Sequence, residues 1–239
     1  MRGVILAAGI GKRLRPLTNH IPKVLLSVGG KSILEHQLDA LHLAGFKEVV
    51  IIIGFNKETV MKTAGNEYKG MKIIYRINNE YDTTNNLRSL WCARDTLNVP
   101  FVQIHGDLIL NSKILYTVIS SSVESAVIID NDSAHFVEDA NRVRSENGRI
   151  IEINKVISFN DCDGKAIGIY KFSQLAAMEY IKNLEESKEN TRDGFEVALR
   201  PTLKKIPFGI IDVTGLPYAE IDDLNDFRDA ELRINDIVK

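Results

Sequence analysis

Short runs of almost purely apolar residues alternate with helical patterns along the first half of the chain. The runs are residues 4–7, 48–53 and 101–105, and residues 32–44 place apolar side chains at a helical spacing between the first two. Continuous apolar runs of this length are typical of parallel strands that are buried on both faces. The alternation therefore predicts an α/β fold, in which helices cover both faces of a Rossmann-like sheet that is mixed but mostly parallel.

The sequence also marks the ends of several predicted elements. Ser32 and Glu35 have the spacing of a capping box, and Gly45 is placed to end the helix that Ser32 begins. Asn147 and Gly148 predict the turn of a β-hairpin over residues 142–153. Further strands are predicted at 72–77, 125–130, 166–173 and 208–215, and further helices at 57–64, 86–97, 174–186, 195–203 and 223–234.

The second half of the chain has a different pattern from the first. Its strands, hairpin and helices follow one another without the regular alternation, which is typical of an α+β arrangement. No segment rich in proline, glycine or serine separates the two halves. We therefore expect one domain over residues 1–239, with a nucleotide-binding half (1–125) and an acceptor-binding, lid-like half (126–239).

Charge and cysteine content exclude several classes of protein. The chain has 30 lysine and arginine residues against 32 aspartate and glutamate residues, a formal net charge of −2, so it has no basic field for binding nucleic acid. Cys92 and Cys162 are its two cysteines and lie far apart, which excludes a disulfide framework and favours a reduced compartment. No stretch approaches the roughly 20 apolar residues of a membrane span, so we expect a cytoplasmic location.

A glycine-rich, basic loop follows the first predicted strand, in the sequence LAAGIGKRLRPLTNHIPKVLL (6–26). A dinucleotide-binding turn needs a third glycine where this loop has Leu14. A Walker A loop needs a serine or threonine hydroxyl after its lysine, where this loop has Arg13. Both assignments therefore fail, although the glycines still allow backbone N–H groups to approach a phosphate closely.

The pattern L-A-A-G-x-G-x-R-L-x-P-L-T, followed shortly by P-K, resembles the signature of the nucleotidyltransferase (nucleoside-diphosphate-sugar pyrophosphorylase) family. This resemblance implies a GT-A-like fold and the transfer of a nucleoside monophosphate to a phosphorylated acceptor, with release of pyrophosphate. In such a loop Arg13 offers a planar fork to the β- and γ-phosphates, while Lys23 lies near the α-phosphate. The alternative is a solvated basic loop. The predicted nucleotide-binding residues are Leu6, Ala7, Ala8, Gly9, Gly11, Lys12, Arg13, Lys23, Asn85 and Gly106.

Two carboxylates are predicted to hold Mg²⁺. Asp107 follows Gly106 at the carboxyl end of an apolar strand, the edge of the sheet on which the glycine loop should also lie. Its alternative role is to cap a following helix. The family resemblance gives Asp222 as the second ligand, while Asp223 is expected to cap the last helix and Asp226 to be an exposed helix residue. Arg13, Lys23 and Asp107 form the predicted catalytic group.

Three stretches of the chain resemble cytidylyltransferases that act on phosphocholine or aminoethylphosphonate. They are Asn85-Asn86-x-x-Ser89-Leu90, Asp139-Ala140-x-x-Val143 and GKAIGIYKFS (164–173). The resemblance favours CTP as donor and a small phosphorylated or phosphonylated acceptor.

Lys155 would contact the acceptor's phosphate by the same resemblance, and Ser89 and Glu220 are further candidates on the acceptor side. Two simpler explanations stay open: Lys155 as an exposed lysine, and Asn85 as a helix cap. The five histidines share no metal-ligand spacing and suggest no nucleophile or base. An aromatic cage for a trimethylammonium group would draw on Trp91, Tyr81, Tyr170, Phe195 and Tyr218.

Two other functions stay open. Sugar-1-phosphate nucleotidyltransferases use the same chemistry, but they have an E-K-P motif where this chain has Asn154-Lys155-Val156. A nucleotide-binding regulatory subunit without activity is the second alternative, although the joint presence of Arg13 and Lys23 with two carboxylates argues against it. The oligomeric state is not indicated by the sequence.

Overall fold

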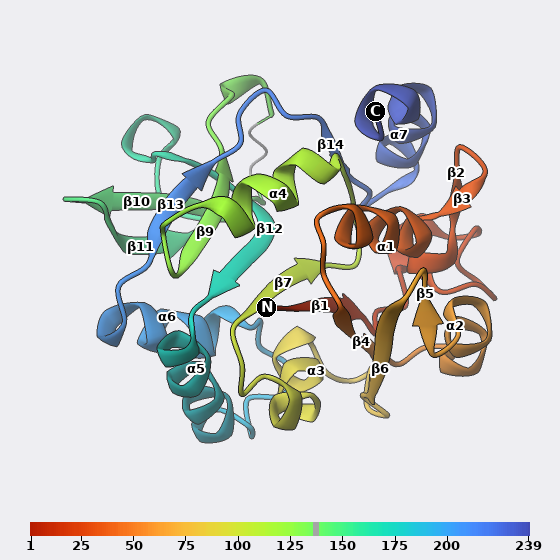
Figure 1. Ribbon diagram of the computed structural model, residues 1–239, viewed down its shortest axis with the longest axis horizontal. Helices are drawn as coiled ribbons and strands as arrows, with labels where there is room; N and C mark the ends of the chain where they lie inside the picture. The colour runs from red at the N-terminus through yellow and green to blue at the C-terminus, as the bar shows by residue number, and fades with distance from the viewer. Residues whose placement is uncertain (136–138) are drawn as a thin grey trace.

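The computed structural model describes residues 1–135 and 139–239, and a mixed sheet runs through the middle of this molecule (Figure 1). Ten strands of the described chain form it, in the order β11-β10-β12-β7-β1-β4-β6-β5, with β9 pairing with β12 and β13. The strands of its first half are β1 (Arg2–Ala7), β4 (Glu48–Ile53), β5 (Glu67–Tyr68), β6 (Met71–Ile77) and β7 (Phe101–His105). Those of its second half are β9 (Ala126–Asp130), β10 (Arg142–Glu146), β11 (Arg149–Asn154), β12 (Gly164–Phe172) and β13 (Gly209–Asp212).

Parallel pairing is concentrated in the first half of the chain. The strands β7, β1, β4 and β6 are parallel neighbours, and β1 is paired in register with β7 from Arg2 opposite Phe101 to Leu6 opposite His105. Beyond β7 the sheet continues through the long strand β12, which is antiparallel to β7, β9 and β10. The expected mixed α/β sheet is therefore confirmed, and one sheet joins the two halves of the chain.

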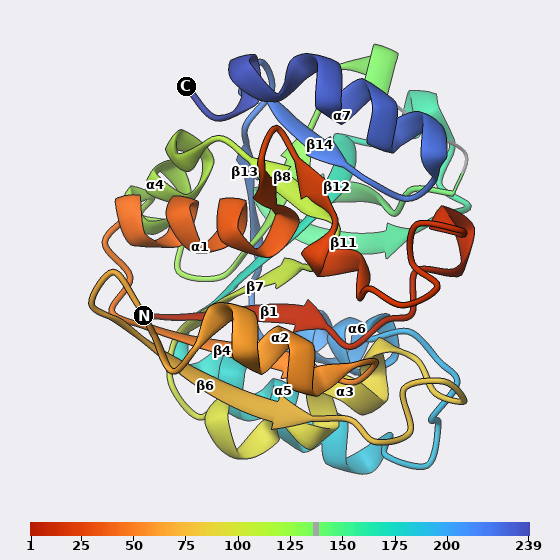
Figure 2. The same cartoon turned by 90° about the vertical axis from the view of Figure 1, so that its right-hand side faces the viewer.

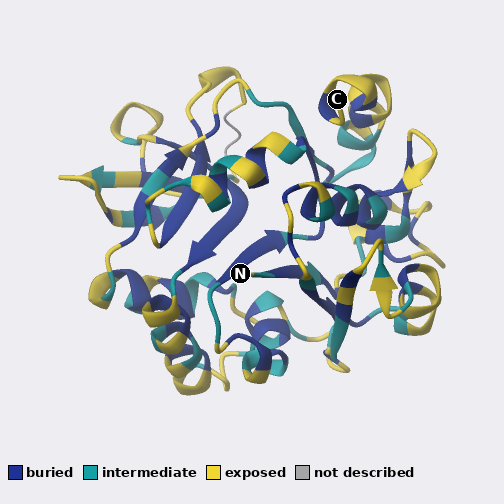
Figure 3. Cartoon of the chain, viewed as in Figure 1, coloured by how far each residue is buried: buried dark blue, intermediate teal, exposed yellow. Residues whose placement is uncertain are grey.

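Seven helices of the described chain surround the sheet (Figures 1 and 2). The helices α1, α2 and α4 pack on one face, and α3, α5 and α6 pack on the other. In Figure 3 the strands of the sheet are mostly dark blue, the colour of buried residues, while the helices are mixed in colour. The helices are α1 (Ile33–Leu43), α2 (Lys57–Ala64), α3 (Asn86–Cys92), α4 (Ser112–Ser120), α5 (Gln174–Glu186), α6 (Glu196–Lys205) and α7 (Leu224–Ile237).

A third hydrophobic cluster attaches α7 to the rest of the molecule. It joins Ile221, Ala230 and Ile234 to Leu14 of the glycine loop. Two short strands, β8 (Leu108–Leu110) and β14 (Tyr218–Glu220), pair antiparallel beneath this helix, and another short pair, β2 (Ser27–Val28) and β3 (Lys31–Ser32), lies before α1. This cluster brings the C-terminal segment of the chain next to the loop that follows β1.

The predicted element ends agree closely with the structure in several places. Ser32 and Glu35 form the expected capping box of α1, and Gly45 follows that helix with φ +87°. The hairpin β10–β11 turns at Asn147 and Gly148 as predicted, and α5 has the predicted bounds. The predicted helix over residues 86–97 is wrong in its second half, because α3 ends at Cys92 and a 3₁₀ turn follows.

None of the described helices has the length and apolar character needed to cross a membrane.

Candidate active site

The glycine loop leaves the carboxyl end of β1 and is held by local contacts. Gly11 has φ +68°, a conformation that favours glycine, and its carbonyl oxygen accepts a hydrogen bond of 2.7 Å from the Thr18 hydroxyl. A Cβ at Gly11 would lie 3.0 Å from Cβ of Lys23, so the loop packs directly against that lysine. Leu14, which excluded a dinucleotide turn, is fully buried and anchors the loop beneath α7.

A cavity of about 320 Å³ lies between this loop and the carboxyl ends of β1 and β7; we call it the loop cavity. Eight of the ten residues predicted to bind the nucleotide line this cavity. Ala8 and Asn85 are the two exceptions. The lining residues are Leu6, Ala7, Gly9, Gly11, Lys12, Arg13, Lys23, Val24, Gly106, Asp107 and Asp222. The predicted common edge for the glycine loop and Gly106-Asp107 is therefore confirmed.

Two cations and two carboxylates meet in the loop cavity. The Lys23 Nζ lies 3.1 Å from both Asp107 Oδ2 and Asp222 Oδ1, and Arg13 Nη2 lies 2.8 Å from Asp222 Oδ1. Sheet pairing causes this proximity, because the backbone N–H of Ile221 donates to the Asp107 carbonyl oxygen at 2.9 Å. Residues 199 positions apart, Lys23 and Asp222, are joined in this way.

The electrostatics of the cavity favour the charged forms of Lys23 and Asp107. Burial alone would lower the pKa of Lys23, but the charges of Asp107 and Asp222 raise it above its usual value. Burial alone would raise the pKa of Asp107, and the positive charge and hydrogen bond of Lys23 instead hold it below its usual value. Lys23 is only 14% exposed, so its ammonium group is placed to meet a ligand that enters the cavity rather than bulk water.

The carboxylate oxygens in the loop cavity fit a magnesium ion that takes its remaining ligands from water and from a bound phosphate group. The Asp107 Oδ1 atom is buried and has no hydrogen-bond partner among the described residues, which is the state of an oxygen available to a cation. The described residues contain no cluster of three or more His, Cys, Asp or Glu side chains arranged to hold a metal. One or two carboxylates completed by water and phosphate oxygens are the usual protein site for Mg²⁺.

A second cavity, of about 250 Å³, adjoins the first because Asp222 lines both; we call it the Lys165 cavity. The Lys165 side chain is only 7% exposed, and its Nζ lies 3.5 Å from Glu220 Oε2 and 5.6 Å from the ring centroid of Tyr218. Burial and the nearby charge of Asp107 raise the pKa of Glu220, and Lys165 opposes this. The lining residues are His135, Lys165, Leu216, Pro217, Tyr218, Ala219, Glu220, Asp222, Asp226, Asp229 and Arg233.

The predicted acceptor residues are not all brought together. Glu220 lines the Lys165 cavity, as just described. Lys155 is exposed and forms a 2.6 Å ion pair with Asp139. The Lys155 hydrogen bond lowers the pKa of Asp139, and neither residue lines the loop cavity or the Lys165 cavity.

Asn85 and Ser89 line neither cavity. The Asn85 side chain accepts a hydrogen bond from the backbone N–H of Asn86 and caps α3, so the capping alternative is confirmed. The Ser89 hydroxyl is buried and accepts a hydrogen bond of 3.1 Å from the Asn78 amide. Both residues therefore have structural hydrogen bonds, and a contact with substrate stays a prediction.

Three expectations about carboxylates have clear outcomes. The alternative of Asp107 as a helix cap is wrong, because β8 follows it and Asn111 caps α4. Asp223 caps α7 as predicted, but Asp226 is half-buried rather than exposed, because its carboxylate accepts hydrogen bonds from the backbone of Asp222 and Asp223.

The aromatic residues that were candidates for a cage are dispersed. Tyr170 and Phe195 pack against each other in the core, with ring centroids 5.0 Å apart. Trp91 lies between the guanidinium groups of Arg88 and Arg94, at 4.1 and 3.9 Å from its ring centroid.

Sequence reasoning missed two residues of the Lys165 cavity, Lys165 itself and His135. Lys165 did leave a signal, because it is one of two lysines, with Lys171, in a mostly apolar strand whose every position is buried. His135 left none, since a single histidine five positions after Asp130 has no spacing that points to a site.

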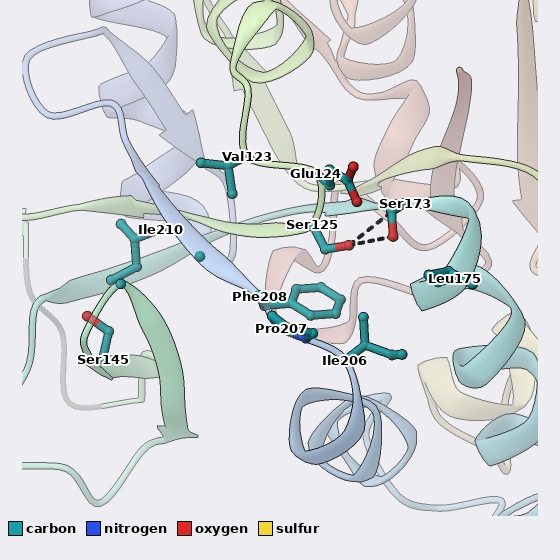
Figure 4. A pocket seen from close by; sticks show the side chains of 12 residues that line it. Val123, Glu124, Ser125, Ser145, Ser173, Leu175, Ile206, Pro207, Phe208 and Ile210 are labelled. Carbon is teal, nitrogen blue, oxygen red and sulfur yellow. Dashed lines mark hydrogen bonds between the residues drawn. The ribbon is translucent and has the colours of Figure 1, made fainter.

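A larger cavity, of about 570 Å³, lies between the β10–β11 turn, β13 and the start of α5 (Figure 4). Its lining is mostly apolar, and the labelled polar groups Ser125 and Ser173 hydrogen-bond to each other. The described residues that line it include no lysine, arginine or histidine. This lining offers no cation to a phosphate group, so the two cavities around Asp222 are the better candidates for an active site.

The family model for nucleotidyl transferases matches residues 2–206 of the chain. The chain is 31% identical over 197 residues to the CTP:phosphoglutamine cytidylyltransferase of Campylobacter jejuni, which covers 76% of each protein. It is 30% identical over 247 residues to the CMP-5'-(3-aminopropyl)phosphonate synthase of Streptomyces rubellomurinus. That match covers 98% of the chain but only 39% of the relative.

The fold matches that of the inositol-1-phosphate CTP transferase from T. maritima, with a TM-score of 0.81 and coverage of 100% of this chain and 97% of that one. The two chains are 19% identical, so this likeness concerns the fold alone. It confirms the fold expected from the signature after β1.

Proposed function

The chain belongs to the nucleotidyl transferase family, and from this premise we propose that it transfers a cytidylyl group from CTP to a small phosphorylated or phosphonylated acceptor and releases pyrophosphate. The observation that carries the proposal is Lys23 between Asp107 and Asp222, with Arg13 on the same Asp222 oxygen. This arrangement in a glycine-lined cavity supports binding of a triphosphate. The names of both relatives, which refer to CMP or CTP, support cytidine as the base.

In the proposed reaction an anionic oxygen of the acceptor attacks the α-phosphorus of CTP in line. A bond forms between that oxygen and the α-phosphorus, the bond to the bridging α–β oxygen breaks, and pyrophosphate leaves with the electron pair. Lys23 donates to the α-phosphate, and Arg13 donates to the β- and γ-phosphates through its planar guanidinium group. Both groups stabilise charge that develops in the transition state. Because the acceptor oxygen attacks the α-phosphorus directly, the proposed reaction has no covalent enzyme intermediate.

Asp107 and Asp222 are the residues that would hold a magnesium ion. Such an ion would neutralise phosphate charge and draw electron density from the α-phosphorus. Lys23 and Arg13 must then move from the carboxylates to the phosphates when the nucleotide enters. The ion pairs with Asp222 hold both cationic groups beside the cavity before a nucleotide enters.

A pyrophosphate-release screen tests the proposal. CTP, UTP, GTP and dTTP are crossed with phosphocholine, 2-aminoethylphosphonate, glycerol phosphate and glucose 1-phosphate, with and without Mg²⁺. We expect release from CTP with a phosphocholine-like or phosphonate acceptor, and a CMP conjugate detected by mass spectrometry. Release from glucose 1-phosphate alone would favour the sugar-nucleotide alternative, and no release from any pair would favour a regulatory binding protein.

A further inference from the structure

Lys23 bridges the two carboxylates that are proposed to hold magnesium. Its Nζ atom lies 3.1 Å from Asp107 Oδ2 and 3.1 Å from Asp222 Oδ1, so one ammonium group contacts an oxygen of each carboxylate. Arg13 Nη2 contacts the same Asp222 oxygen at 2.8 Å. A metal ion that used these oxygens would have to replace both cations, so Lys23 and Arg13 compete with a metal for the same ligands.

The partial burial of these groups strengthens the competition. The Lys23 side chain is 14% exposed and the Asp107 side chain 24% exposed, so water screens their interaction less than it screens a pair at the surface. Asp107 Oδ1 has no hydrogen-bond partner among the described residues and is the oxygen most open to a metal. A divalent cation on that oxygen would still lie close to the Lys23 ammonium group and be repelled by it.

The charges that line the loop cavity favour an anion as the first ligand. Lys12, Arg13 and Lys23 face two carboxylates, so the described lining carries one net positive charge. Lys23 also begins beside the glycine loop, because a Cβ at Gly11 would lie 3.0 Å from Cβ of Lys23. Its four-carbon stem is flexible, so its ammonium group can reach a phosphate group that the loop holds.

We propose that Lys23 and Arg13 occupy the metal-binding carboxylates until a triphosphate takes both cations, and that Asp107 and Asp222 then bind the divalent cation. Nucleotide and metal therefore bind with positive cooperativity, and each raises the affinity for the other by the same factor. Couplings of this kind are typically about 5- to 150-fold. This inference rests on the proposed cytidylyl transfer and adds the order in which its ligands bind.

The first test measures Mn²⁺ binding to the protein without nucleotide, by the electron paramagnetic resonance signal of free Mn²⁺. Lys23→Met should bind Mn²⁺ about tenfold more tightly than the wild-type protein, because the competing cation is lost. Arg13→Met should bind Mn²⁺ about threefold more tightly, since Arg13 is 65% exposed and more strongly screened. That exposure also makes Arg13→Met the variant to use if Lys23→Met does not fold.

Two further variants control this test. Lys72→Met, which changes a lysine that is 70% exposed and outside both cavities, should leave the Mn²⁺ affinity unchanged. Adding Asp107→Asn to Lys23→Met, or to Arg13→Met, should abolish the gain, which would locate the metal at Asp107. The proposal is overturned if neither Lys23→Met nor Arg13→Met binds Mn²⁺ more tightly, or if the gain persists without the Asp107 carboxylate.

The second test measures CTP binding by calorimetry, once with EDTA and once with Mg²⁺. Asp222→Asn should bind CTP about threefold or more tightly than the wild-type protein in EDTA, because Arg13 and Lys23 lose a competing partner. With Mg²⁺ the same variant should bind CTP more weakly, because a metal ligand is lost. Glu220→Gln is the matched control, since Glu220 contacts Lys165 instead of the loop cations and lies outside the loop cavity.

The effect of Asp222→Asn on CTP affinity must therefore change sign with the metal. A change of the same sign in EDTA and in Mg²⁺ overturns the proposal, as does an equal gain in EDTA for Glu220→Gln. Tighter Mn²⁺ binding by the variants, with no pyrophosphate release by the wild-type protein from any pair, would contradict the proposed reaction alone. Normal cytidylyl transfer, with a Mn²⁺ affinity that neither substitution raises, would contradict this inference alone.

Discussion

The loop cavity and the Lys165 cavity share Asp222 but are built in different ways. The loop cavity takes most of its lining from one continuous segment, residues 6–24, and adds Gly106, Asp107 and Asp222. The Lys165 cavity takes its lining from β12, β14, α7 and the turn after β9. The residues of a site made by one loop can be recognised in a short stretch of sequence. The residues of a site made by four elements come together only when these elements pack.

The lysines of the two cavities differ in how many carboxylates lie close to them. Lys23 has two carboxylates at 3.1 Å, and these hold its pKa above the usual value. Lys165 is more deeply buried and has one carboxylate, at 3.5 Å. We infer that the two carboxylates neutralise the charge of Lys23 until a nucleotide enters, whereas the charge of Lys165 is available to interact with a second ligand. The following predictions test this difference, in order of decreasing effect.

Asp107→Asn should have the largest effect. The change removes one negative charge from the carboxylate pair that is proposed to hold magnesium, so we expect turnover to fall by about a hundred- to a thousandfold. The melting temperature should stay near the wild-type value. The pyrophosphate-release assay measures this, with Asp95→Asn, which changes an exposed carboxylate paired with Arg76, as the matched control. Near-normal turnover of Asp107→Asn would exclude a catalytic role.

Lys23→Ala should lower turnover by about a hundredfold, because a donor to the α-phosphate is lost while both carboxylates remain. The KM for CTP should also rise. Lys72→Ala is the control, since this lysine is 70% exposed and lies 3.7 Å from Glu48, outside both cavities. If the two variants turn over equally fast, the loop cavity is not the nucleotide site.

A comparison of Lys165→Met with Lys155→Met sharpens the contrast on the acceptor side. The buried Lys165 should matter more, and we expect its loss to raise the acceptor KM about tenfold or more. The exposed Lys155, paired with Asp139, should change the acceptor KM by about twofold at most. Steady-state kinetics with the same acceptor measures both values. A larger rise in acceptor KM for Lys155→Met than for Lys165→Met would show that Lys155 contacts the acceptor's phosphate.

Asp39 on α1 provides a reference outside both cavities, where ion pairs act on stability alone. Burial tends to raise its pKa, but hydrogen bonds from Lys31, Lys69 and Tyr68 lower the pKa to about 2. A pKa lowered by folding stabilises the folded state above the unfolded value near 4, and this stabilisation is lost as the pH falls from about 4 toward 2. Its two lysine partners are half-exposed, so we expect a contribution of about 1 kcal/mol.

Urea unfolding of the wild-type protein and Asp39→Asn measures this contribution. The difference between their free energies of unfolding should be about 1 kcal/mol at pH 6, smaller at pH 3, and close to zero only near or below pH 2. A difference that does not depend on pH would show that the Asp39 ion pairs add no net stability. Transfer activity at pH 6 should be the same in both proteins.

Much of the loop cavity was predictable from the sequence. Strand β1, the glycines after it and Gly106-Asp107 were expected at one edge of the sheet, because parallel strands bring their carboxyl ends together. Asp222 came from the family resemblance alone. Its place beside Asp107 depends on the pairing of β14 with β8, two strands of three residues that the sequence pattern did not reveal.

The Lys165 cavity was not predictable in the same way. The predictions for Lys155, Ser89 and Asn85 came from local patterns, and the structure gives two of these residues structural hydrogen bonds. The network of Asp130, His135 and Tyr218 joins residues 88 positions apart. No periodicity or spacing in a single sequence records such a contact.

The sequence by itself determined the parallel core, the glycine loop and the charged groups that enter the loop cavity. Periodic burial and backbone conformation depend on residues that are close in the sequence, so a short stretch of sequence is enough to predict them. Only the tertiary structure decided that Asp222 faces Lys23 and that His135 and Lys165 share a cavity. Those contacts depend on antiparallel pairing and on the packing of α7, which are long-range outcomes of burying the third hydrophobic cluster against the glycine loop.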